Sequence, residues 1–215
     1  RIAGIYAKVG EYVEAGRILA ETENGDLVAE VARKQAALAQ AEASLASLKV
    51  GTRSEELAVA SIAVLNAQAA LVNAIQSAYT VSDDAVRNRT DIFFTNPRTN
   101  PKLLFTVANV ELETTVINDR VAAEAVLANW ALLVGKLSNS NAADSAQQAF
   151  AHIAQVSTFL ADVNAAINQG IPNQTISAAT LFSYATTLAT ARANVNTAAT
   201  ALTTSAAALD AARST

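Results

Sequence analysis

Apolar residues recur at helical spacing along most of the chain, and the clearest stretch is the last one. Between Ser177 and Ser214, apolar and small residues follow one another at intervals of three and four positions. This spacing is typical of a helix that packs along a neighbour. The pattern predicts a helix over about 177–214, with a hairpin seam formed by Leu181, Leu188, Val195, Leu202 and Leu209.

Three further stretches have the same period and predict helices at about 27–94, 106–137 and 142–169. Within the first stretch the apolar register changes near Gly51, where Thr52 and Glu55 have the spacing of a capping box, so we expect a kink there.

Prolines and glycines mark the ends of these helices. Pro97 and Pro101 end the first, because proline lacks a backbone donor and disfavours helix at the residue before it. Gly170 and Pro172 end the third. Short connections make neighbouring helices antiparallel, so we expect a long helical hairpin expanded to a four-helix up-down bundle over 27–215.

The first 26 residues have a different pattern, in which short apolar runs are separated by glycines. Such runs predict short strands, and Gly10 and Gly16 can supply the positive φ that the turns between them require. We therefore expect a small β segment at 1–26, ahead of a mainly α fold.

The β segment also carries a family resemblance. V-G-E-x-V-x-A-G-R-x-L-A, beginning at Val9, resembles the first half of a biotinyl-lipoyl-like domain, with Val9, Gly10, Val13, Gly16 and Leu19 as its motif positions. A long Ala-rich helix follows directly, and S-L-x-x-L-K-x-G-T-R-S-E-E-L at 44–57 looks like a first hairpin arm. This order resembles the membrane fusion protein (periplasmic adaptor) family, here with an inserted helical pair.

The resemblance implies a periplasmic subunit that forms a ring and couples an inner-membrane transporter to an export path. The implied partners are that transporter, an outer-membrane channel and further copies of the chain. The family's Arg, Leu and Ser docking pattern is not found in 94–105 or 170–175, so the residues themselves give no sign of the channel contact. The chain begins at Arg1 in mid-pattern, so we expect a membrane anchor before it and a second lipoyl half after Thr215.

A true lipoyl or biotin carrier needs a lysine at a hairpin tip. Lys8 lies in the first strand pattern, and Lys34 and Lys49 lie in the following helix, so no prosthetic group or other cofactor is expected. The net charge is −4, without a basic stripe, which excludes nucleic acid as a partner. Cysteine is absent, which excludes thiolate sites. No uninterrupted apolar run is long enough for a membrane span, so none is expected within these residues.

Residues with catalytic or metal-binding chemistry are few. The single histidine, His152, has no acidic neighbour in sequence, so it is interpreted as structural and no enzyme activity is expected. Asp83, Asp84, Glu111 and Glu113 lack the alternating spacing of a calcium loop, so no metal site is expected.

The densest mixed-charge cluster lies at 83–91, and Arg120 and Glu124 of the next predicted helix are placed to meet it. Interhelical ion pairs are the first interpretation. The alternative is a pocket for an anionic ligand lined by Arg87 and Arg120, as in an extracytoplasmic four-helix-bundle sensing domain. A structural coiled coil of a surface layer is a third function compatible with the helices.

Overall fold

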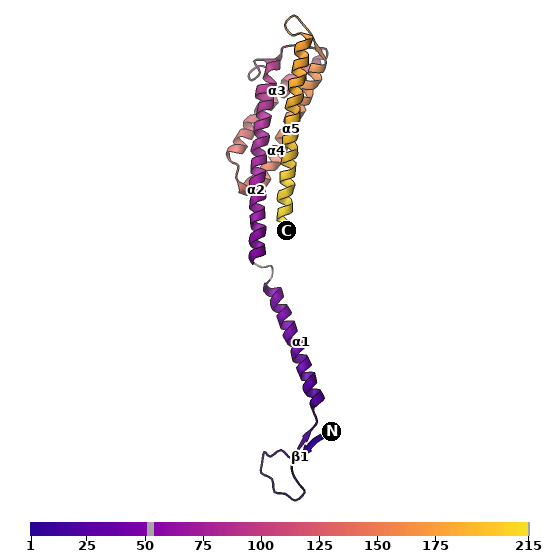
Figure 1. The fold of residues 1–215 in the computed structure, drawn as a ribbon. Helices are drawn as coiled ribbons and strands as arrows, with labels where there is room; N and C mark the ends of the chain where they lie inside the picture. The colour runs from indigo at the N-terminus through magenta and orange to yellow at the C-terminus, as the bar shows by residue number, and fades with distance from the viewer. Residues whose placement is uncertain (51–53, 215) are drawn as a thin grey trace. The chain divides into compact units, whose positions relative to one another are not determined.

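The computed structural model describes residues 1–50 and 54–214 and is mainly helical, with 74% of the chain in helices (Figure 1). The described residues contain five α-helices: α1 (Gly25–Val50), α2 (Ser54–Asp83), α3 (Val110–Gly135), α4 (Ala142–Asn168) and α5 (Ala178–Arg213). The mainly helical fold class predicted from periodicity is thus confirmed. The predicted kink at Gly51 and the cap at Thr52 lie outside the described residues.

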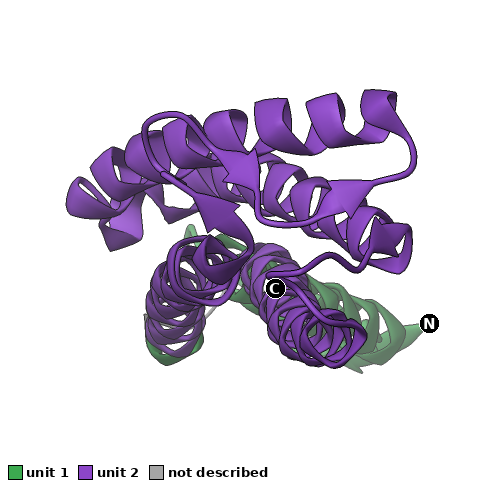
Figure 2. Ribbon diagram, turned by 90° about the horizontal axis from the view of Figure 1, so that it is seen from above, with its two compact units in different colours: residues 1–56 green, residues 57–215 purple. Residues whose placement is uncertain are grey.

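The chain divides into two compact units, Arg1–Glu56 and Leu57–Thr215 (Figure 2). The sequence placed a boundary between 26 and 27 instead. The difference arises because no described side chain of the first unit, including those of α1, is buried. An apolar core is therefore a property of the second unit alone.

In the first unit, strands β1 (Ile2–Ile5) and β2 (Ala20–Thr22) form an antiparallel pair in which Ile5 lies opposite Ala20. Gly10 and Gly16 in the connecting loop have φ values of 90° and 94°, a region that favours glycine. The loop is barely packed, with Val9 107% and Tyr12 91% exposed. A strand pair is present, but a lipoyl-like domain is not shown.

In the second unit, α3 packs against α4 and α4 packs against α5. Figures 1 and 2 show α2 and α5 side by side, with the pair of α3 and α4 against them. One apolar core runs through all four helices, and from α5 it takes in Leu181, Leu188, Val195, Leu202 and Leu209. The packing of this unit is therefore bundle-like.

Short strands and caps hold the loops at one end of the unit. β3 (Phe94–Thr95) pairs with β4 (Lys102–Leu103), and β5 (Thr106–Val107) pairs with β6 (Gly170–Ile171). Asn109 caps α3 by accepting hydrogen bonds from the backbone of Glu111 and Leu112 at 2.9 and 3.2 Å. The sequence pattern predicted loops at 95–105 and 170–176 but placed Phe94 and Thr106–Val107 in helices, because two-residue strands are too short to show a period.

The helical stretch Glu55–Phe93 includes a long apolar segment. It contains a window with mean hydropathy 1.7, long and apolar enough to cross a membrane by length and composition alone, and 11% of that window is buried. The expectation that these residues contain no membrane span therefore stays a prediction.

Candidate functional site: an ion-pair network between α2 and α3

Helix α2 does not continue to residue 94 as predicted. It passes into a π-helical turn at Asp84–Arg89 and a 3₁₀ turn at Asp91–Phe93. The wide turn is closed by the Thr90 amide, which donates to the carbonyl of Ala85 at 3.1 Å, and the Thr90 hydroxyl donates to the carbonyl of Val86 at 2.8 Å. Such turns insert an extra residue into a helix and are frequent at functional sites.

The π-helical turn brings Arg87 to α3. Its Nε donates to Glu124 Oε1 at 2.9 Å, its second terminal nitrogen also contacts that oxygen, and its first donates to Asp83 Oδ1 at 2.8 Å. Arg87 therefore joins a carboxylate of its own helix to one of the neighbouring helix.

Arg120 lies on α3 and is fully buried, with 0% exposure. Its two terminal nitrogens donate to Glu124 Oε2 at 3.0 Å and to Asp91 Oδ1 at 2.6 Å. Arg98, from the loop between β3 and β4, reaches the other oxygen of Asp91 at 3.3 Å. The network thus has three carboxylates and three guanidinium groups, and its formal charges balance.

The carboxylate at the centre of the network is Glu124. Burial by itself would raise the pKa of Glu124, but hydrogen bonds from Arg87 and Arg120 outweigh burial and leave it below its usual value. The hydrogen bond to Glu124 in turn raises the pKa of Arg87. Both shifts favour the charged forms of Glu124 and Arg87.

A second ion pair lies on the outer side of the π-helical turn. Asp84 accepts from Arg89 Nε at 2.6 Å and from Asn88 at 3.0 Å. These two hydrogen bonds lower the pKa of Asp84. The mixed-charge cluster of the sequence is therefore two separate sets of ion pairs, and only one of them reaches α3.

Five of the six guanidinium nitrogens of Arg87 and Arg120 donate to carboxylates of the chain. An anionic ligand in contact with either guanidinium would have to displace Glu124, Asp91 or Asp83. These contacts favour the interpretation as interhelical ion pairs, and the ligand pocket stays a prediction. One donor, Arg120 Nε, is buried without a hydrogen-bond partner among the described residues.

His152 lies on α4 beside Trp130 of α3, with ring centroids 5.5 Å apart. Tyr79 of α2 also contacts Trp130 edge-on, with ring centroids 5.9 Å apart. Burial lowers the pKa of His152. No hydrogen bond or ion pair joins the His152 side chain to another described residue, so its contacts are those of an aromatic packing residue.

Two carboxylates that the sequence pattern did not single out meet between α3 and α4. Burial, together with a hydrogen bond and charge repulsion from Asp162, raises the pKa of Asp119. No pattern in the sequence indicates that these two carboxylates meet, because Asp119 and Asp162 are far apart in the chain. Among the described residues no group of three or more potential metal-ligating side chains occurs.

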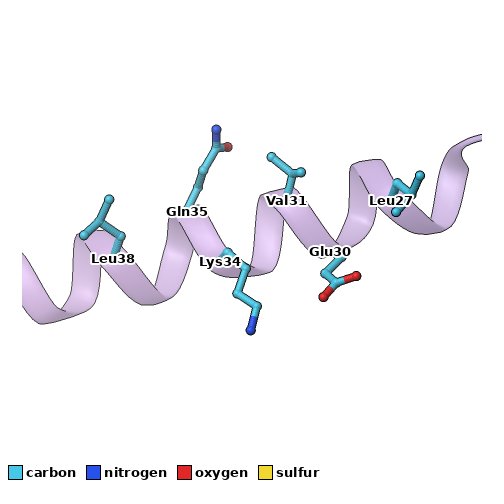
Figure 3. Close-up of a pocket in the computed structure, with 6 residues that line it drawn as sticks. All are labelled: Leu27, Glu30, Val31, Lys34, Gln35 and Leu38. Atoms are coloured by element: carbon cyan, nitrogen blue, oxygen red, sulfur yellow. The ribbon is translucent and has the colours of Figure 1, made fainter.

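A shallow apolar groove lies on α1, lined by Leu27, Glu30, Val31, Lys34, Gln35 and Leu38 (Figure 3). All six residues belong to one helix, so the groove has no second wall. It is therefore a helix face against which another helix can pack, and it is not enclosed as a ligand site would be.

No family model, curated protein or solved structure matches this chain. Of the motif positions in the β segment, Val9, Gly10, Gly16 and Leu19 are exposed and Val13 is half-buried, so they do not assemble a core of their own.

Proposed function

We propose that this chain is a non-catalytic periplasmic adaptor, a subunit that assembles with further copies and couples an inner-membrane transporter to an export path. The observation that carries the proposal is the exposed seam of α1. Its large apolar residues Leu27, Val31, Leu38, Leu45 and Leu48 are between 51% and 80% exposed. Their spacing is that of a coiled-coil seam, which requires a partner helix.

The sequence motifs support the finer part of the proposal. The glycine-turn segment that starts at Val9 lies directly before α1, in the order found in adaptors with a lipoyl-like domain. On this proposal α2 to α5 form an up-down expansion of the helical hairpin. The Arg87, Glu124 and Arg120 network then fixes the inserted pair of helices, α3 and α4, to the arm.

Site-specific photo-crosslinking in the cells that produce the protein tests this function. A crosslinking amino acid at Leu38 lies on the seam, and the same amino acid at exposed Ala36 lies on the opposite face of α1. We expect Leu38 to capture a membrane transporter component or further copies of the chain, identified by mass spectrometry, and Ala36 to capture neither. Equal capture at both positions, or capture of cytoplasmic proteins alone, would contradict an adaptor role.

A further inference from the structure

Two short segments of the chain have the acceptor pattern for N-linked glycans, which is asparagine, then any residue except proline, then serine or threonine. They are Asn88-Arg89-Thr90 and Asn173-Gln174-Thr175. The pattern by itself does not tell the two apart. The surroundings of the asparagine and the threonine do, because a transferring enzyme has to reach both side chains.

The first segment is closed off by its own contacts. It belongs to the π-helical turn, where the side-chain nitrogen of Asn88 donates to Asp84 Oδ1 at 3.0 Å. Thr90 is buried, with 0% exposure, and its hydroxyl donates to the carbonyl of Val86 at 2.8 Å. An enzyme reaches this threonine only if the turn unfolds, so Asn88 is not an acceptor in the folded chain.

The second segment lies in the loop between β6 and α5, at one end of the second unit (Figure 1), and all three of its residues are exposed. Pro172 precedes it with a fixed φ, and Ile176 follows it with a buried side chain that is 5% exposed. The backbone of Asn173 donates to the carbonyl of Ile176 at 2.9 Å. The segment therefore combines exposure with a defined conformation.

The side chain of Asn173 is held by its oxygen alone. Oδ1 accepts hydrogen bonds from the backbone of Thr175 at 2.8 Å and of Ile176 at 2.7 Å, which is an Asx turn. No hydrogen bond to another described residue engages Asn173 Nδ2. Hydrogen bonds to the oxygen of an amide draw electrons away from its nitrogen and make the N–H more acidic. Nδ2 is therefore accessible and can give up a proton when it attacks a sugar.

We propose that Asn173 carries an N-linked glycan in the cells that produce the chain. Nδ2 attacks the anomeric carbon of an oligosaccharide that is linked to a polyprenyl pyrophosphate. The new bond joins that carbon to Nδ2, while the bond from the carbon to the pyrophosphate oxygen breaks and its electron pair leaves with the lipid pyrophosphate. The proton released from Nδ2 passes to a base of the transferase.

A glycan at this position is bulky and hydrophilic, and it would shield the neighbouring side chain of Ile171, which is 48% exposed. The inference goes beyond the adaptor role and shares one requirement with it. The transfer takes place outside the cytoplasm, so the inference rests on the extracytoplasmic location proposed above.

Mass spectrometry of the chain isolated from the cells that produce it tests the proposal. We expect the peptide with Asn173 to carry the mass of an oligosaccharide and the peptide with Asn88 to carry none. Asn173→Asp keeps an oxygen acceptor for the Asx turn but has no amide nitrogen, so it should lose the glycan with unchanged helical circular dichroism. Thr175→Ser should keep the glycan and Thr175→Ala should lose it, whereas Asn88→Gln should leave the glycan in place.

An unmodified Asn173 in the natural chain would overturn the proposal, and so would a glycan that survives Asn173→Asp. Asp26→Thr adds a comparison in the same cells, because it places a threonine two residues after exposed Asn24. A glycan at Asn24 with none at Asn173 would overturn the acceptor site and leave the extracytoplasmic location in place. Absence of a glycan at both positions would overturn the proposal as well, and the crosslinks from Leu38 then decide the adaptor role separately.

Discussion

Arg120 is a fully buried cation, and the carboxylates around it decide its effect on stability. Transfer of a guanidinium from water to the interior costs several kcal/mol, which is offset only when the charge is paired and hydrogen-bonded. Glu124 and Asp91 provide this pairing on two sides. The network therefore makes the packing of α3 on the π-helical turn depend on a few polar contacts.

Glu124→Gln should destabilise the fold, because it leaves both Arg120 and Arg87 without their shared counter-charge. We expect a loss of about 2–4 kcal/mol in the free energy of unfolding. This is somewhat less than is usual when a buried ion pair loses one partner, because Asp91 still contacts Arg120. Urea unfolding followed by circular dichroism measures the change. Asp210→Asn, at an exposed carboxylate of α5, is the control and should change the free energy by less than about 0.5 kcal/mol. An equal loss in the two variants would show that the network contributes little.

The carboxyl of Asp119, which lies beside Asp162, has a raised pKa, so its contribution to stability falls as the pH rises. This is opposite to the effect of Glu124, whose pKa is lowered. A carboxyl whose folded-state pKa is raised binds its proton more tightly in the folded state, so it lowers stability above that pKa and the penalty disappears as the pH falls toward 3.8. Asp162→Asn removes the repulsion, so we expect a higher Tm than that of the natural chain at pH 7. At pH 3, below the raised pKa of Asp119, the two Tm values should converge. A constant difference at the two pH values would assign the effect to packing.

At the scale of the elements, the large apolar residues of α5 differ in how far they are covered by the rest of the chain. Leu202 is 0% exposed and packs in the core, whereas Phe182 on the same helix is 76% exposed. Both residues lie in a helix predicted from its period, and the period alone does not tell how completely each face is covered. The stability of α5 therefore comes mainly from its buried seam.

Leu202→Ala should cost about 2–5 kcal/mol, because it removes buried methyl groups and leaves a cavity. Phe182→Ala removes a larger side chain from the surface of the same helix and should change the free energy of unfolding by less than about 0.5 kcal/mol. Thermal unfolding of the two variants provides the comparison. If Phe182→Ala is the more damaging substitution, the outer face of α5 is covered by a partner in solution.

At the scale of the whole molecule, the two units differ in what holds them together. The first has an exposed strand pair and an exposed helix, and the second has one continuous core. An amphipathic helix without a partner is marginally stable in water. The first unit is accordingly the part of the chain that depends most on assembly.

Removal of residues 1–56 should leave the thermal unfolding of the remaining chain unchanged within about 2 °C, since no described side chain there is buried. Hydrogen exchange of the whole chain should show the same division. Backbone amides should exchange slowly in α3, α4 and α5 and fast in α1. Protection of α1 that rises with protein concentration would show that copies of the chain cover its seam. Destabilisation by the truncation would instead show that the first unit packs on the second.

Periodicity determined the helical elements of this protein, because the interval between apolar residues is a local property of the chain. The predicted helices at 106–137, 142–169 and 177–214 coincide with α3, α4 and α5 to within a few residues. Gly10 and Gly16 were likewise identified as turn residues from their own conformational freedom.

Only the tertiary structure decided which charges meet. The sequence placed Arg87, Arg120 and Glu124 in one cluster, but it did not show that Arg98 joins them or that Asp119 meets Asp162. Contacts between helices depend on their rotation and register, and the π-helical turn at Asp84–Arg89 changes both by inserting one residue. That turn depends on how the buried residues Val86, Thr90 and Phe93 are accommodated in the packed core, so it has no counterpart in the apolar period of the chain.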